Sequence, residues 1–288
     1  MTLAQKILYI WRIFAKLLSF ACFGVGGFIL GTAWFPTLFV ASGFSRKRFG
    51  KWARYSIHLS LKLFVIEMEL LGLLTLNVEH RERLKEQKSK VVVANHPSLL
   101  DVVMLYSLIP NADCIVKGSL AENRFIRGII NAIYIPNSRS FDEQLKNAAT
   151  SLNQGNCLII FPEGTRSVSG MPWTFKKGAA RFALSAQKDV LPIYFGGNEI
   201  IGLRKYDKLL SYHPTSRYYY NLDVLEPIEI ATYLHCPKGQ AASMLTEKML
   251  EVFEERRRKD PYKKWYYEGT NCDGLSDDIV KNFYYLRK

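Results

Sequence analysis

The chain contains 288 residues, of which 48% are hydrophobic, and its 39 Lys and Arg residues against 26 Asp and Glu residues give a formal net charge of +13. This composition suffices for one sizeable core plus a membrane-associated segment, and the charge predicts a polyanionic partner such as an anionic membrane or a phosphorylated substrate. The five scattered cysteines, with no Cys-x-x-Cys pair, exclude a disulfide framework and a cysteine-based zinc site.

The first predicted element is an apolar helical segment near the N-terminus. Leu17–Val40 contains no charged residue and is long enough to cross a bilayer, although its glycines and Pro36 also suit a bent or re-entrant helix. Basic residues flank it on both sides, with a modest excess after it, so the positive-inside rule places the bulk of the chain in the cytoplasm. Tyr55–Leu76 is a second apolar stretch, whose charged residues favour an interfacial helix.

Together these two stretches predict a membrane-anchoring helical hairpin over residues 1–75, which either spans the bilayer or dips into it. The alternative is a pair of buried core helices in a soluble protein. A nucleic-acid-binding protein would suit the charge, but no recognisable binding module is present, and such a protein would not need Leu17–Val40. We therefore expect no nucleic-acid partner.

From residue 76 onward, short apolar strands alternate with amphipathic helices, which predicts an α/β domain over residues 76–288 with a mainly parallel central sheet flanked by helices. The predicted strands are Lys90–Ala94, Ala112–Val116, Ala132–Ile135, Cys157–Phe161, Val190–Phe195 and Tyr218–Leu225. The predicted helices are Pro97–Leu108, Glu122–Asn131, Asp142–Asn153, Lys176–Gln187 and Gln240–Lys259. The last helix and the tail that follows it are basic and aromatic, which suits a membrane interface or an ordinary surface.

A histidine and an aspartate follow the strand Lys90–Ala94. Pro97 is expected to open the next helix and biases His96 away from the helical conformation. On a regular helix, five residues turn through about 500°, so His96 and Asp101 would not share a face. They can pair only if His96 lies before the helix and folds back, in which case Asp101 would orient one ring nitrogen and leave the other able to take a proton. The alternative is a helix-capping His and a solvent-facing Asp.

A second polar turn follows the predicted strand Cys157–Phe161. Gly164 permits a close backbone approach, Thr165 offers a hydroxyl, and Arg166 offers a planar fork suited to phosphate. Glu163 is expected to orient either Arg166 or a backbone amide. Ligands of open α/β sheets gather beyond the carboxyl ends of the strands, where this turn and His96 would both lie. The alternative is an ordinary turn with a surface ion pair.

Taken together and in this order, the two motifs resemble those of the membrane-associated glycerophospholipid acyltransferases of the lysophosphatidic acid acyltransferase type. Asn95–Asp101 matches the family's His-x4-Asp motif, and Phe161–Arg166 matches its Glu-Gly-Thr-Arg motif. Two weaker motifs also match: Tyr134–Arg139 resembles the segment that ends in a substrate-binding Arg, and Val190–Ile193 resembles an apolar Val-Pro motif. Lys117 matches a Lys often found after the second strand.

The resemblance covers residues 75–230 and implies transfer of a fatty acyl group from an acyl-CoA or acyl-ACP thioester to a hydroxyl of a lysophospholipid-like acceptor. The expected acceptor is 1-acylglycerol-3-phosphate, and the product would be phosphatidic acid. His96, oriented by Asp101, would act as general base, and backbone amides near Ser98 are candidates to stabilise the oxyanion. The residues expected to bind the acceptor's phosphate or headgroup are Glu163, Gly164, Thr165, Arg166, Arg139 and Lys117.

The sequence departs from the family pattern in residues near those expected to bind the acceptor. Many lysophosphatidate enzymes carry another residue at Pro97, and acidic residues where this chain has Asn137 and Ser138. The chain also looks like family members that act on other lipids, including those of aryl-polyene pathways. Two further alternatives are a hydrolase that uses water at the same His96 and a non-catalytic lipid- or phosphate-binding membrane adaptor.

The resemblance implies no cofactor and no metal, because the acyl thioester is a substrate. The remaining histidines, at positions 58, 80, 213 and 235, form no metal-ligand spacing such as His-Glu-x-x-His. The expected partners are anionic membrane lipids and the acyl donor, with acyl carrier protein as one form of that donor. The expected location is the cytoplasmic face of a membrane, the inner membrane in a bacterium, with the N-terminal helices as the anchor.

Overall fold

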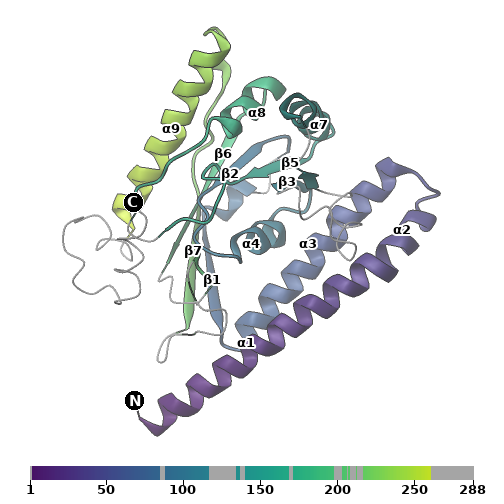
Figure 1. Cartoon of the computed structure of the whole chain (residues 1–288), viewed down its shortest axis with the longest axis vertical. Coiled ribbons are helices and arrows are strands. Elements are labelled where there is room, and N and C mark those ends of the chain that lie inside the picture. Colours follow the sequence, from purple (N-terminus) through teal and green to yellow (C-terminus); the bar gives the residue numbers. More distant parts are fainter. Residues whose placement is uncertain are drawn as a thin grey trace.

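The strands of the protein form one seven-stranded sheet in a computed structural model that describes residues 2–84, 88–116, 134–136, 140–168, 171–197, 203–205, 207, 212 and 217–260. The strands are β1 (Leu74–Glu79), β2 (Val91–Ala94), β3 (Ala112–Val116), β4 (Tyr134–Pro136), β5 (Cys157–Ile160), β6 (Val190–Gly197) and β7 (Tyr218–Val224). Their spatial order is β1-β7-β6-β2-β5-β3-β4 (Figure 1).

The sheet is mainly parallel, as predicted. The strands from β6 to β4 in this order all pair in parallel. β1 and β7 pair in parallel with each other, whereas β7 pairs antiparallel with β6. β1 and β7 therefore run against the other five strands, and the carboxyl ends of β2 and β5, which carry the predicted site residues, lie side by side at one edge.

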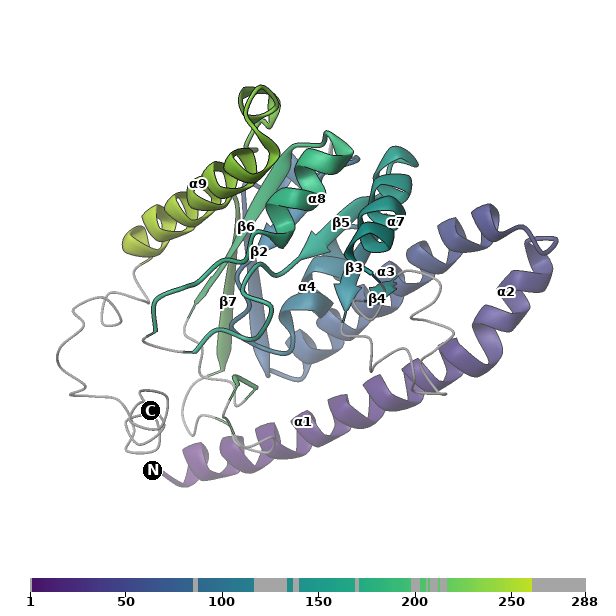
Figure 2. The ribbon, with the colours of Figure 1, turned by 45° about the horizontal axis from the view of Figure 1, so that its top comes forward.

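Helices cover both faces of the sheet (Figure 2). One face carries α3 (Arg46–Leu70) and α4 (Asp101–Leu108), and the other carries α7 (Phe141–Asn153), α8 (Gly178–Ala186) and α9 (Lys238–Lys259). The fully apolar strand β2 contributes side chains to the hydrophobic core on each face of the sheet, because alternate side chains of a strand point to opposite faces. Val92 and Ala94 belong to the core beside α3 and α4, whereas Val91 and Val93 belong to the core beneath α7, α8 and α9.

The N-terminal region forms two long helices that lie side by side. α1 (Leu3–Ile29), a π-helical turn (Leu30–Trp34) and α2 (Phe35–Ala41) make one continuous helix of 39 residues, Leu3–Ala41, which is long and apolar enough to cross a membrane. α3 then returns along it (Figure 1). The predicted pair of helices is present, and its use as a membrane anchor stays a prediction.

α3 belongs to this hairpin and to the core at the same time. Arg54 on α3 donates from Nε and Nη2 to the carboxylate of Asp113 on β3, at 2.7 and 2.9 Å. Ile57, Val65 and Met68 are buried in the same core as α4. The predicted boundary after residue 75 falls inside β1, so the chain passes from the hairpin into the sheet without a linker.

Several predicted elements need correction. The apolar stretch Tyr55–Leu76 does not form one helix, because α3 ends at Leu70 and Gly72 adopts a positive φ of 73° that turns the chain into β1, a strand that the sequence pattern did not predict. α4 begins at Asp101 rather than at Pro97, for reasons given below. The other predicted strands and the helices corresponding to α7, α8 and α9 are confirmed to within a few residues. Glu122–Asn131 and the tail after residue 260 lie outside the described residues.

Candidate active site

His96 and Asp101 meet at the carboxyl end of β2. His96 lies two residues beyond the strand, and the chain turns at residues 98–100 before α4 begins at Asp101. The turn folds the imidazole back, and His96 Nδ1 lies 2.8 Å from Asp101 Oδ2. The ring stacks on Phe161, with centroids 4.1 Å apart. The His96 side chain keeps 19% of its exposure whereas Asp101 keeps none, so a substrate can approach the ring but not the carboxylate.

The Asp101 carboxylate accepts four hydrogen bonds. His96 Nδ1 and the Ser98 N–H, at 2.7 Å, reach Oδ2, while Ser98 Oγ and Tyr220 Oη reach Oδ1 at 2.9 and 3.0 Å. A buried carboxylate needs such partners to remain charged. The same bonds explain why the helix starts late: the Ser98 N–H and hydroxyl both bind Asp101, and this side-chain bonding competes with a helical turn at Pro97.

Tyr220 is a site residue that the sequence analysis missed. It lies on β7, is fully buried, and touches both Asp101 and the Ser98 hydroxyl. Burial, followed by the nearby charge of Asp101, raises the pKa of the Tyr220 phenol well above its usual value, so it remains a proton donor. The only hint in the sequence was the run Tyr218–Tyr220 in a predicted strand. Its partner depends on the antiparallel register that sets Tyr220 opposite Gly197, which no local pattern specifies.

Glu163 fixes the backbone of His96. Its Oε1 accepts from the His96 N–H at 3.0 Å and from Ser167 Oγ at 2.7 Å, and the Ser167 N–H donates to the His96 carbonyl at 2.7 Å. Burial raises the pKa of Glu163. Of the two roles expected for this glutamate, the structure therefore shows the contact with a backbone amide. The two predicted turns are joined directly to each other.

The rest of the Glu163–Arg166 turn is more open. Gly164, with φ +70°, and Thr165 are exposed, and a side chain at Gly164 would meet Lys176 Nζ at 2.9 Å, which places a cation against this turn. Arg166 is half-buried, and its Nη1 donates to the carbonyls of Leu203 and Arg204 at 3.1 and 2.8 Å. Lys117 and Arg139, the other two expected binding residues, lie outside the described residues.

The backbone amides near Ser98 are not available for the oxyanion role expected of them. The N–H groups of Ser98, Leu99 and Leu100 donate to Asp101 Oδ2, to the Leu203 carbonyl and to Ser98 Oγ, respectively. They build the turn that holds Asp101, and that use removes them from contact with a substrate.

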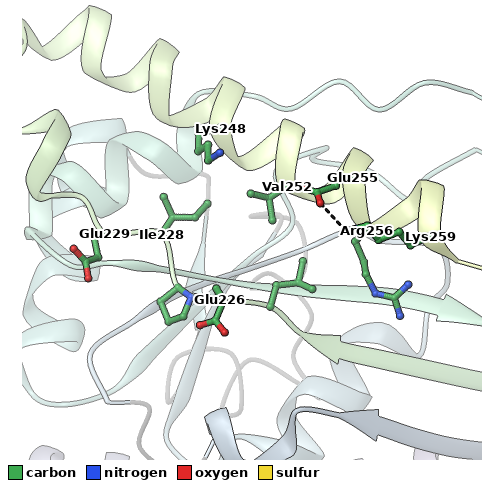
Figure 3. A pocket seen from close by; sticks show the side chains of 10 residues that line it. Glu226, Ile228, Glu229, Lys248, Val252, Glu255, Arg256 and Lys259 are labelled. Atoms are coloured by element: carbon green, nitrogen blue, oxygen red, sulfur yellow. Dashed lines mark hydrogen bonds and ion pairs between the residues drawn. The ribbon is translucent and has the colours of Figure 1, made fainter.

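Two other features of the described residues lie away from these motifs. Glu79, His80 and Asp223 bring ligand-type atoms within 4.8 Å of one another, but Arg256 already binds both carboxylates and supplies the positive charge. Nearby, a cavity of about 450 Å³ opens between α9 and the segment after β7 (Figure 3). Its lining mixes acidic with basic side chains, and no predicted site residue contributes to it.

Comparisons with known proteins point in one direction. Residues 75–196 match the family model described as Acyltransferase. The chain is 31% identical over 164 residues to an uncharacterized acyltransferase of Schizosaccharomyces pombe, a match that covers 52% of this chain and 55% of that protein. It is 24% identical over 267 residues to 1-acyl-sn-glycerol-3-phosphate acyltransferase alpha of Homo sapiens, covering 84% of this chain and 91% of that protein.

A solved structure has the same fold. The crystal structure of the 1-acyl-sn-glycerophosphate acyltransferase from Thermotoga maritima matches with a TM-score of 0.62 at 19% sequence identity, covering 85% of this chain and 98% of that chain.

Proposed function

We propose that the chain transfers a fatty acyl group from an acyl-CoA or acyl-ACP thioester to a hydroxyl of a lysophospholipid-like acceptor, because its residues 75–196 match the Acyltransferase family model. The acceptor we propose is 1-acylglycerol-3-phosphate, which is a substrate class named in its relatives, and the product is phosphatidic acid. The observation that carries the proposal is the 2.8 Å contact between His96 Nδ1 and the fully buried Asp101.

The proposed reaction begins with the acceptor's hydroxyl. His96 Nε2 takes its proton as the oxygen attacks the thioester carbonyl, and Asp101 stabilises the imidazolium that forms. The carbon–sulfur bond then breaks, and the leaving thiolate takes the proton from His96, so an ester and a free thiol result. The hydroxyl itself is the nucleophile, and no acyl-enzyme is required. General-base catalysis of this kind accelerates a reaction by roughly 10²–10⁴-fold.

Acceptor binding is proposed at the turn Glu163–Arg166. This turn is tied to the main chain of His96 through Glu163 and Ser167, so a phosphate held there is positioned relative to the base. Lys176 adds a cation beside Gly164. Arg166 donates from Nη1 to two backbone carbonyls, which gives the residue a structural role. The other N–H groups of its guanidinium can still donate to an anion.

Membrane association is proposed through the N-terminal helices. α1 exposes large apolar side chains, among them Ile10, Trp11 and Phe14, although a soluble helix turns such residues inward. We propose that this face contacts anionic lipid at the cytoplasmic surface of a membrane, consistent with the +13 net charge of the chain.

The test is product analysis with the purified full chain, a thioester donor and lysolipid acceptors. A new ester is expected, and His96→Ala and Asp101→Asn should each reduce its formation by at least about 10²-fold without unfolding the protein. Release of free fatty acid alone would point to the hydrolase alternative. Normal turnover by His96→Ala would contradict the mechanism, and absence of thioester consumption would favour the adaptor.

An acceptor panel separates the remaining alternatives. Lysophosphatidate, a lysolipid without a phosphomonoester and an aryl-polyene lipid differ in headgroup but share a reactive hydroxyl. The proposal expects lysophosphatidate to give the highest kcat/KM, because the acceptor site is a cationic turn. A preference for the aryl-polyene lipid would keep the chemistry and reject the acceptor.

A further inference from the structure

The face of α1 that packs against the rest of the molecule is its polar face. Arg12, Ala15, Lys16 and Ser19 are its buried residues, while Trp11 and many other apolar residues of the helix are exposed. Arg12 and Lys16 are one helical turn apart and keep only 6% and 4% of their exposure. The helix thus holds two cations between its apolar outer face and the folded domain.

Among the described residues, the guanidinium of Arg12 has no anionic partner. Its carbon Cζ lies 5.7 Å from the ring centroid of the buried Tyr212, and its Nε and Nη1 are shielded from solvent with no hydrogen-bond partner in the part of the chain that the structure describes. A cation–π contact satisfies the face of a guanidinium but not the N–H donors at its edge. Arg does not lose its charge in a protein, and burying that charge without an acceptor is costly. The position therefore calls for an anion.

Two acids, Asp207 and Glu67, lie beside this face of α1. Asp207 attracts Lys16 electrostatically, and its carboxylate accepts from Nε and the backbone N–H of Arg204 at 3.0 and 3.1 Å. Glu67 on α3 accepts from Ser19 Oγ at 3.2 Å through Oε1, whereas its Oε2 is buried with no hydrogen-bond partner among the described residues. Among the described residues, neither carboxylate hydrogen-bonds to Arg12. The missing acceptor must come from outside the described part of the chain.

We propose that Arg12, with Lys16 beside it and Tyr212 as an aromatic wall, binds the phosphate group of a membrane phospholipid whose acyl chains lie along the exposed face of α1. A phosphate offers several strong acceptors and forms charge-assisted hydrogen bonds with a guanidinium. The exposed side chains of Leu8 and Trp11 flank Arg12 and supply apolar contact for the acyl chains. This site is distinct from the turn Glu163–Arg166 and does not depend on acyl transfer.

The test measures lipid binding by the full chain in detergent, without an acyl donor, by native mass spectrometry. Three probes separate the sources of the anion: a short-chain phosphatidylglycerol, a diacylglycerol with the same chains, and inorganic phosphate. Arg12→Gln is expected to weaken phosphatidylglycerol binding by about 10–100-fold, the range expected for charged hydrogen bonds, and to leave diacylglycerol binding unchanged. Inorganic phosphate that binds as tightly as phosphatidylglycerol would overturn the lipid assignment.

Three further variants serve as controls. Lys6→Gln removes an exposed charge from the same helix and should bind phosphatidylglycerol like the wild type. Arg12→Lys keeps the charge and should fall between wild type and Arg12→Gln, which guards against misfolding of the neutral variant. His96→Ala should bind lipid normally, so that failure of this site and failure of the proposed function can be distinguished. Equal binding by wild type and Arg12→Gln, or an equal loss in Lys6→Gln, would overturn the proposal.

Discussion

At the scale of single residues, Asp101 depends on groups that lie far apart in the sequence. Ser98 lies three residues away, whereas Tyr220 reaches the same oxygen from β7. The Tyr220 phenol stays protonated because burial and the charge of Asp101 raise its pKa. We therefore regard Tyr220 as a positioning residue that acts on the proposed base, His96, through Asp101.

Removal of the Tyr220 hydroxyl tests this role. Tyr220→Phe is expected to lower kcat by about tenfold or more, because a hydrogen bond to a charged group contributes about 1.5–3 kcal/mol. The KM for the acceptor should stay unchanged. Tyr219→Phe, on the neighbouring residue of the same strand, is the control, and an equal kcat in all three proteins would argue for a purely structural tyrosine.

The pairing of His96 with Asp101 was accessible from the sequence because it is local. Pro97 keeps His96 out of the helix, and only a few residues separate the two side chains. The turn geometry was predicted incorrectly, since Ser98 binds Asp101 and delays α4. Tyr220 was inaccessible, because its contact depends on the pairing of β6 with β7 rather than on any neighbouring residue.

At the scale of elements, a charged network joins β1, β7 and α9. Asp223 on β7 accepts from His80 Nδ1 at 2.7 Å and from Arg256 Nε, and Arg256 Nη2 donates to Glu79 at 3.1 Å. Burial alone would raise the pKa of Asp223, but the hydrogen bonds from His80 and Arg256 lower it below its usual value. The network holds the two strands that run against the rest of the sheet to the last described helix.

Asp223→Asn is expected to reduce the free energy of unfolding by about 2 kcal/mol at neutral pH, because it removes the charge that Arg256 and His80 bind. A carboxylate with a lowered folded pKa stabilises the protein above its unfolded value of about 3.9 and stops doing so as the pH falls through the folded value. The difference between wild type and variant should therefore shrink below about pH 4.

Urea denaturation at several pH values measures this difference. Glu251→Gln, which breaks an exposed pair with Lys248 on α9, is the control and should change stability by less than about 1 kcal/mol. A difference for Asp223→Asn that persists unchanged to the most acidic measurable pH would contradict the electrostatic explanation.

The parallel strands and their helices were predictable, since short apolar runs alternate with amphipathic stretches. β1 was hidden because it follows an apolar helix with only a short turn at Gly72, and its partner β7 lies far away in the sequence. β1 is only partly buried, and its composition differs little from that of the apolar helix before it. The sequence therefore does not mark where the strand begins.

At the scale of the whole molecule, the long N-terminal helix faces outward with its apolar side. Phe14 keeps 56% of its exposure, and residues from Leu3 to Val40 repeat this pattern along the helix. The fully folded domain lies on the other side, with α3 shared between the two parts. This arrangement predicts that the chain binds bilayers through one defined surface.

Phe14→Asp should reduce partitioning onto phosphatidylglycerol-containing vesicles by about 10–100-fold, because burying a phenylalanine contributes about 1.5–3 kcal/mol. Vesicle flotation measures the bound fraction. Leu234→Asp places the same charge on an exposed apolar residue away from α1 and should leave partitioning unchanged. Equal flotation of wild type and Phe14→Asp would place the membrane-binding surface elsewhere.

The ion pair between Arg54 and Asp113 has a consequence for substrate choice. It locks the hairpin to the central sheet, so the imidazole is held at a constant height above whatever surface supports α1. Under the proposed function, a base fixed in this way would select alcohols by their depth in a lipid layer: hydroxyls lying at that level would react, and those lying deeper or raised on a large sugar would not. A shorter or longer N-terminal hairpin would then change which lipid is modified, without any change to the side chains of the proposed active site.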